Sequence, residues 1–182
     1  MSNYYYVDLT SYLNNRGFTT DRDYYRGFLS LGESSLPEEQ VNFDKVYFCN
    51  DVPFRLCKNE NFDNMATEGQ RIDFPVLKVK KIHFLGVSNN GDLFDFLYFM
   101  FNSTCAYRTK LCFSDFISSE PAFGDQIAIN FTYMNTRSGR LDHYKPNIWY
   151  YPITLEKNAE INGIEFEDNP SMHVFAITIE TE

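Results

Sequence analysis

Apolar side chains recur at alternate positions in many short stretches of this chain, and Asn, Asp, Gly, Ser and Pro separate these stretches. Alternation with a period of two is typical of strands that bury one face, and helical periodicity is weak throughout. The pattern therefore predicts an all-β chain, an antiparallel β-sandwich of about ten strands with almost no helix. The expected strands are Tyr4–Leu9, Val46–Cys49, Val52–Leu56, Gly69–Phe74, Lys80–Gly86, Phe94–Phe101, Tyr107–Phe113, Ala128–Tyr133, Asn147–Tyr151, Gly163–Phe166 and His173–Glu180.

Turn residues predict how some of these strands connect. Asn50-Asp51 separates two apolar runs, and both residue types tolerate the positive φ of a tight hairpin turn. A second hairpin is expected to turn through Asn102–Cys105. The polar segment Asn14–Glu39 reads as a long loop, with at most a helical turn near Pro37–Gln40.

Composition and charge narrow the class of protein. The 182 residues suit a single domain over 1–182, and the 18 Phe and 13 Tyr favour half-buried strands. The net charge is −9 and no basic stripe occurs, which argues against nucleic acid or an anionic membrane as a partner. No apolar run approaches the roughly 20 residues of a membrane helix, so no membrane insertion is expected.

The first ten residues lack the basic and apolar regions of a secretory signal, which predicts a cytoplasmic protein, although unconventional release stays open. The four cysteines match no zinc spacing. Hairpin register does not place Cys105 opposite Cys112, so reduced thiols are expected.

Five blocks of sequence follow one another in a recognisable order. The first three are Val7–Thr10 with Asn14–Phe18, Val52–Leu56 with Asp63-Asn64 and Glu68–Asp73, and Ile82–Gly86 with Asn90–Asp92. The last two are Phe113–Phe116, an "FSDW"-like motif, and Asp168–Pro170 with His173–Thr178, a "DNP..HIFAIT"-like ending. Together they resemble the galactose-binding-like modules attached to bacterial glycoside hydrolases, fucosidase-type enzymes among them. The resemblance implies a jelly roll with a carbohydrate-associated, non-catalytic role.

The chain also departs from that pattern. Phe116 stands where the family has Trp, Met134 where an Arg is expected, and Thr154 where a Pro is expected. An Arg at this position could donate several hydrogen bonds from its planar guanidinium to sugar hydroxyls. Because that Arg is missing, the ligand specificity of the family cannot be assigned to this chain. No enzyme domain is present in these 182 residues.

A sugar site on a β-sandwich needs an aromatic face with amides and carboxylates around it. Alternation puts Trp149 and Tyr151 on one face of their strand and Tyr150 on the other. If Trp149 is instead the core tryptophan of the sandwich, Tyr150 or Tyr151 would be the exposed platform. The polar residues of loops can either bind hydroxyls or shape their own turns. The candidate ligand-binding residues are Trp149, Tyr151, Asn90, Asp92, Asp115, Asp63, Asn64 and Tyr133.

Calcium is the metal that the donor set favours, because oxygen ligands are abundant while His and Cys are sparse. The resemblance implies a structural calcium where the first and last strands meet. Zinc is not expected, since the three histidines lie in separate segments without a paired Cys. The candidate calcium ligands are Asp8, Asn14, Asn15 and Asp21, with Asp23 and Glu180 in addition.

No nucleophile elbow, metalloprotease motif or phosphate-binding loop occurs, so we do not expect an enzyme. Asp115 and Glu120 are a conceivable carboxylate pair for glycoside hydrolysis, but any acidic chain offers such pairs. The sequence predicts a carbohydrate-binding module or lectin, for which a homo-oligomer would supply multivalency. The alternative is a protein-interaction or assembly module on the same sandwich that lacks sugar binding.

Overall fold

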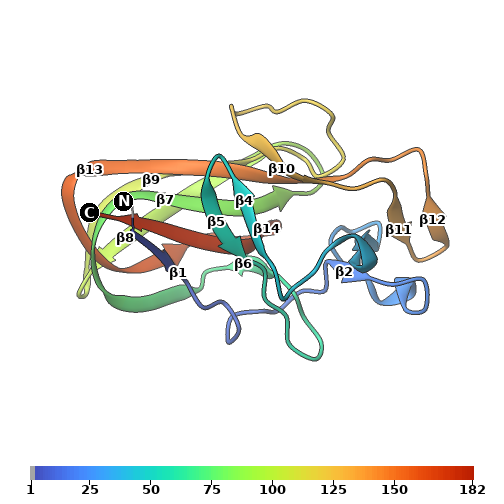
Figure 1. The fold of residues 1–182 in the computed structure, drawn as a ribbon, viewed down its shortest axis with the longest axis horizontal. Coiled ribbons are helices and arrows are strands. Elements are labelled where there is room, and N and C mark those ends of the chain that lie inside the picture. Colours follow the sequence, from blue (N-terminus) through green and yellow to red (C-terminus); the bar gives the residue numbers. More distant parts are fainter. Residues whose placement is uncertain (1–2) are drawn as a thin grey trace.

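The structure, a computed structural model, describes residues 3–182 except for the side chains of 156–158. It is a β-sandwich built almost wholly from antiparallel strands, as the alternation predicted (Figure 1). The strands of its largest sheet are β1 (Asn3–Tyr6), β6 (Met65–Glu68), β7 (Arg71–Ser88), β8 (Leu93–Phe101), β9 (Thr104–Phe113), β10 (Gln126–Asn130), β13 (Asn147–Phe166) and β14 (Asp168–Thr181). Their order is β1-β14-β7-β13-β8-β9, with β10 paired to β13 and β6 paired to β14.

Two long strands run through both layers of the sandwich. β7 and β13 curve round together at one end of the molecule, so that each contributes its first half to one layer and its second half to the other (Figure 1). Their pairing continues across the bend, from Thr154 opposite Lys81 to Ala159 opposite Val79. The single sheet therefore folds over onto itself and encloses the core.

The core lies between these layers. Trp149, Phe84 and Ile177 are fully buried there, and β8 and β9 add residues from the opposite layer, Phe113 among them. Glycine is required at position 86, where β7 lies against Phe113 of the opposite layer. A Cβ built at Gly86 would lie 2.1 Å from the Phe113 ring and 2.6 Å from the carbonyl oxygen of His173. The layers can pack this closely because Gly86 has no side chain.

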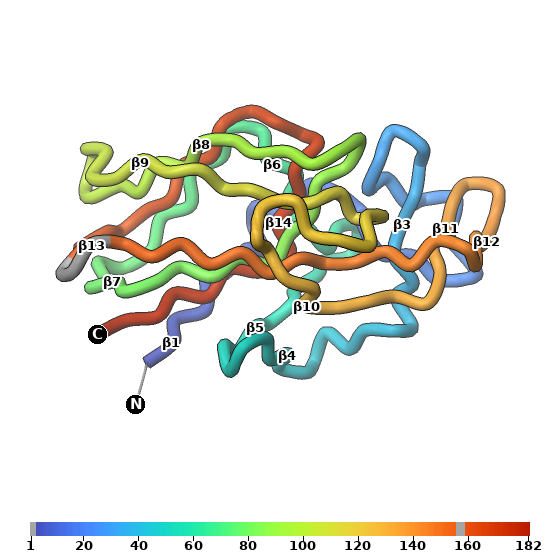
Figure 2. Tube along the Cα trace, turned by 90° about the horizontal axis from the view of Figure 1, so that it is seen from above, coloured from blue at the N-terminus to red at the C-terminus, as the bar shows by residue number. Residues whose placement is uncertain are grey.

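A hairpin and a small sheet complete the fold (Figures 1 and 2). The hairpin turns through Asn50 and Asp51, which both have positive φ, as predicted, and Phe54 packs its ring 6.0 Å from that of Tyr150. The segment predicted as a long loop contains short elements, including the predicted turn after Pro37. The hairpin consists of β4 (Val46–Cys49) and β5 (Val52–Arg55). The small sheet consists of β2 (Phe18–Thr19), β3 (Ser34–Pro37), β11 (Met134–Thr136) and β12 (Gly139–Leu141). The two short 3-10 helices are η1 (Tyr24–Arg26) and η2 (Glu38–Gln40).

Several predicted boundaries were wrong. The two strands expected at Gly69–Phe74 and Lys80–Gly86 are one strand, β7, and those at Asn147–Tyr151 and Gly163–Phe166 are halves of β13. The residues at the bend of β7 are mostly exposed, so the alternation that marks a strand is lost there. β14 also breaks the predicted alternation, because its register shifts between Val174 and Ala176.

The register of the β8–β9 hairpin confirms that Cys105 and Cys112 do not face each other, since they lie opposite Met100 and Phe94. Cys49, Cys57, Cys105 and Cys112 are all free thiols. Among the described residues, no helix has the length and apolar character needed to cross a bilayer.

Candidate functional site

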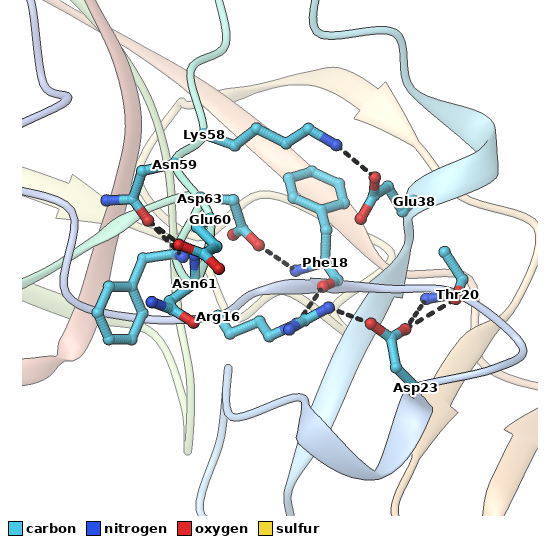
Figure 3. A pocket seen from close by; sticks show the side chains of 11 residues that line it. Arg16, Phe18, Thr20, Asp23, Glu38, Lys58, Asn59, Glu60, Asn61 and Asp63 are labelled. Carbon is cyan, nitrogen blue, oxygen red and sulfur yellow. Dashed lines mark hydrogen bonds and ion pairs between the residues drawn. The ribbon is translucent and has the colours of Figure 1, made fainter.

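Several pockets lie among the loops at the end of the sandwich away from the chain termini, and the most polar of them is lined by the start of β2 and by the β5–β6 loop (Figure 3). We call it the Asp63 pocket, and its volume is about 390 Å³. It is lined by Arg16, Phe18, Thr20, Asp23, Glu38, Lys58, Asn59, Glu60, Asn61, Phe62 and Asp63.

Asp63 connects the two walls of this pocket, the β5–β6 loop and the start of β2, by hydrogen bonds. Its carboxylate accepts hydrogen bonds from the backbone N–H of Gly17 at 2.8 Å and of Phe18 at 3.0 Å, and from Nδ2 of Asn64 at 2.9 Å. Burial raises the pKa of Asp63 to about 6, although these hydrogen bonds and the charge of Arg16 act in the opposite direction. Asp63 is thus a structural anchor whose charge changes in the range of mild acidity.

Arg16 is held in place on the β2 side of the pocket. Its guanidinium forms an ion pair with Asp23 and donates from Nε to the carbonyl oxygen of Phe18 at 3.4 Å. Asp23 in turn accepts from the backbone N–H and hydroxyl of Thr20 at 2.7 and 2.8 Å. Burial opposes ionisation of Asp23, but the hydrogen bonds from Thr20 and the charges of Arg16 and Arg26 outweigh it and lower its pKa. Arg16 is therefore oriented before any ligand arrives.

The opposite wall is a tight turn. Oδ1 of Asn59 accepts from the backbone N–H of Asn61 at 2.9 Å and of Phe62 at 2.8 Å, which fixes the loop. Phe62 stays 38% exposed beside the pocket. Among the described residues, the side chains of Glu60 and Asn61 make no hydrogen bond or ion pair, so their polar atoms are available to a ligand.

The charges of the pocket limit what it can hold. Lys58 donates from Nζ to Oε1 of Glu38 at 2.6 Å, so each cation of the pocket has a carboxylate partner. Carboxylates outnumber cations in the lining. The site therefore favours a neutral, hydroxyl-rich ligand, or a cationic one, over phosphates and other anions.

A buried polar network lies behind the Asp63 pocket. Nδ2 of Asn89 lies 3.0 Å from Nε2 of His173, and Nδ1 of His173 lies 2.9 Å from Oδ1 of Asn64. Because an amide nitrogen can only donate, Nε2 accepts and the proton of the neutral ring is on Nδ1. Burial lowers the pKa of His173 to about 3, so the ring is neutral near pH 7. Asn89 and His173 also line a second pocket of about 330 Å³, the His173 pocket, with Phe28 and Leu31.

Asn90 and Asp115 line a third pocket, and their polar atoms shape its walls. Asp115 accepts from the backbone N–H of Gly91 at 2.6 Å and of Ile117 at 3.1 Å, and Oδ1 of Asp92 accepts from the backbone N–H of Asp115 at 2.9 Å. Burial raises the pKa of Asp115 against these hydrogen bonds. Asp115 therefore shapes its own turn through Ile117, while its bond with Gly91 and that of Asp92 with Asp115 join two segments that are distant in sequence.

The aromatic residues proposed from the sequence lie in the interior, with the exception of Tyr151. Trp149 is fully buried and donates from Nε1 to the carbonyl oxygen of Asp115 at 3.0 Å, so no face of its ring can reach a sugar in solution. The core alternative is correct for this residue. Tyr150 is also buried, and Tyr151 is half-buried. Tyr133 is buried, with the Arg140 guanidinium 3.6 Å from its ring centroid.

The candidate ligand-binding residues thus do not form one site. Asp63 lines one pocket and Asn64 lies in the network behind it, while Asn90 and Asp115 belong to another pocket. The residues that the sequence reasoning missed are Arg16, Lys58, Asn59, Glu60, Asn61 and Phe62. The polar run from Lys58 to Asn64, interrupted by one Phe, was the available signal for five of them.

The candidate calcium ligands also have separate partners. Asp8 accepts from the backbone N–H of Thr10 at 2.9 Å, and Oδ1 of Asn14 accepts from the backbone N–H of Ala66 at 2.7 Å. Asn15 contacts Asn64, and Asp21 lines a shallow pocket with Glu39. The structure does not bring these four side chains together as one ligand set. Among the described residues, no group of three or more His, Cys, Asp or Glu could hold a metal ion.

The comparisons with known proteins agree with the fold. No curated protein matches the chain significantly. Residues 3–182 match a family described as the AziU2-like beta-sandwich domain, which covers nearly the whole sequence. This chain therefore belongs to the AziU2-like beta-sandwich domain family.

Proposed function

We propose that this protein is a non-catalytic carbohydrate-binding module and that it holds a neutral sugar in the Asp63 pocket. The observation that carries the proposal is the combination of an exposed aromatic ring, Phe62, with the unpartnered side chains of Glu60 and Asn61 on a loop fixed by Asn59. An aromatic face covers the apolar side of a sugar ring, and amides and carboxylates bind its hydroxyls.

The resemblance to galactose-binding-like modules supports the same role. Arg16 places a guanidinium at the pocket, which the expected position, Met134, lacks, although its Nε and Nη2 already donate to Phe18 and Asp23. The carboxylate of Asp63 is occupied by backbone N–H groups and that of Asp115 likewise, which suits structural roles better than acid–base chemistry. A negative pocket also disfavours acidic glycans, so uncharged sugars are the ligand class.

Because a single sugar site binds weakly, several linked copies of the site would bind a glycan more tightly. The proposal therefore includes a homo-oligomer. One sugar site commonly binds with a Kd of about 1 mM, and linked sites raise the overall avidity without new contacts. Light scattering after size exclusion would give the oligomeric state. Sugar binding that is equally strong in an oligomer and a monomeric variant would contradict this part of the proposal.

The test is a glycan array followed by calorimetry on the sugar class that binds, with calcium and again with chelator. Phe62→Ala and Asn61→Ala should each weaken binding about tenfold or more, the size of one lost stacking or hydrogen-bonding group. Phe28→Ala is the matched control, because Phe28 is also an exposed aromatic but lines the His173 pocket. Loss of binding in chelator would place calcium at the site.

If protein shown to be folded by circular dichroism binds no glycan on the array, the proposal is overturned. Chromogenic glycosides test whether the protein is non-catalytic. Hydrolysis by the wild type that is lost in the Asp115→Asn variant would show that it is an enzyme. The protein-interaction alternative has support at a different surface, on the β8–β9 hairpin.

A further inference from the structure

The outer face of the β8–β9 hairpin carries an aromatic and cationic surface. Side chains alternate along β8, so Leu97 and Phe99 are buried in the core while Phe94, Phe96 and Tyr98 lie on the opposite side. The register places Lys110 opposite Phe96 and Arg108 opposite Tyr98 on this side. We call these five residues the hairpin face.

The two cations are stacked on the aromatic rings. The guanidinium carbon of Arg108 lies 3.6 Å from the Phe96 centroid, and Nζ of Lys110 lies 3.8 Å from the Phe94 centroid. Cation–π contacts of this kind hold long side chains in place while leaving their donors exposed. The hairpin face thus presents two oriented positive charges on its β9 side, whereas Glu165, which lies opposite Tyr98, and Glu167, which accepts from the Tyr98 hydroxyl, are on its other side. Such a face is complementary to an acidic partner.

The backbone beside this face is unpaired on one side. β9 is the last strand of the large sheet, and among the described strands it pairs with β8 alone. It spans ten residues, and Thr104, Ala106, Arg108 and Lys110 are exposed along it. The last three residues of β9 are buried, so the accessible edge runs from Thr104 to Lys110 and offers its N–H and C=O groups to an added strand.

The charges on the edge select the added strand. A second copy of the same edge would bring like charges from Arg108 and Lys110 together, which disfavours self-pairing. A strand with carboxylates at alternate positions would instead lay them on the hairpin face beside Arg108 and Lys110. The carboxylates would form charge-assisted hydrogen bonds there.

We propose that the β9 edge binds an extended acidic segment of a partner protein as an additional strand, with alternate carboxylates over the hairpin face. This inference does not depend on sugar binding in the Asp63 pocket. The partner is defined by its chemistry, an extended segment with Asp or Glu at every second position and small or β-branched residues between them.

The probe is a fluorescent octapeptide of alternating Glu and Val with blocked ends, and its binding is followed by anisotropy. The chain should bind it and should not bind the matching Lys–Val peptide. Arg108→Gln combined with Lys110→Gln should weaken binding tenfold or more. Lys78→Gln combined with Lys80→Gln is the matched control, because these exposed lysines lie on β7 outside the hairpin face and should leave binding unchanged.

Two N-methylated peptides separate strand addition from simple charge attraction. One carries methyl groups on the Glu nitrogens and the other on the Val nitrogens, so their charge is the same. Alternate N–H groups of a strand point to the same side, so only one of the two should lose binding.

Equal binding by both methylated peptides would overturn the proposal, as would equal binding by the wild-type and Arg108→Gln/Lys110→Gln proteins. Binding of polygalacturonate at this face without competition from the peptide would also overturn it, in favour of an acidic glycan. Dimerisation that buries the β9 edge and excludes the peptide would do the same.

Discussion

Asn64 and His173 lie 109 residues apart in the chain and are joined inside the protein by a hydrogen bond of 2.9 Å. The bond links the loop that precedes β6 to β14, and it also sets the tautomer of His173, whose other nitrogen accepts from Asn89. The neutral imidazole of His173 therefore supports both the Asp63 pocket and the His173 pocket.

This bond predicts a pH dependence. Burial lowers the pKa of His173 to about 3, below its ordinary value, so its stabilising effect is complete above about pH 6.5 and declines as the pH falls toward 3. The contribution to the slope reaches about 1.4 kcal/mol per pH unit. Urea unfolding of the wild type and His173→Gln between pH 4 and pH 7 should show this slope in the difference between their free energies of unfolding. Parallel curves would contradict it.

Asp63 predicts the opposite dependence. Its pKa is raised to about 6, so its contribution to stability is present below the ordinary pKa and declines as the pH rises through 6. Asp63→Ala leaves the N–H groups of Gly17 and Phe18 unpaired and should cost on the order of 2–4 kcal/mol near pH 5. The difference from wild type should shrink toward pH 8. Asp21→Ala, at an exposed position, is the control and should change stability by less than about 0.5 kcal/mol.

Gly86 predicts a steric coupling between the two layers. Gly86→Ala should destabilise the protein by about 1–3 kcal/mol, because its Cβ would overlap the Phe113 ring. Phe113→Leu should recover part of this loss in the double variant, but not all of it, since the His173 carbonyl oxygen remains 2.6 Å away. Thermal unfolding of the four proteins measures the coupling. Strictly additive losses would show that the ring is not the obstacle.

The cysteines should differ in reactivity. Cys105 is exposed, Cys112 is buried, and burial is the largest of the causes that raise the pKa of Cys57 to about 11. Because the thiolate is the reactive form, iodoacetamide at pH 8 should modify Cys105 first and Cys57 and Cys112 much more slowly. Mass spectrometry of the alkylated peptides gives the order. Modification of Cys57 as fast as Cys105 would contradict the described environment.

Local signals predicted much of the fold. The β4–β5 hairpin and its Asn50-Asp51 turn follow from residues adjacent in sequence, and so does the β8–β9 hairpin. The bends of β7 and β13 could not be found in this way. Exposed residues on both faces of a bending strand erase the alternation, and only the packing of the two layers shows that the strand continues.

The candidate site was less predictable, since it depends on contacts between distant segments. Asp63 was identified by its residue type, but its role comes from the N–H groups of Gly17 and Phe18, more than 40 residues away. Trp149 shows the converse. An aromatic side chain in an amphipathic strand has the same local sequence whether it faces a core or a ligand, and burial alone distinguishes the two.

The shared strands β7 and β13 have a mechanical consequence. A sandwich whose sheets are separate can slide or part at the interface, whereas here each layer is continuous with the other through two covalent crossings. Separating the two layers therefore requires β7 and β13 to unpair at their bend, which couples the stability of one layer to that of the other. We expect slow folding for the same reason, because the β7–β13 ladder pairs residues 63 to 94 positions apart, from Trp149 with Gly86 to Glu165 with Arg71.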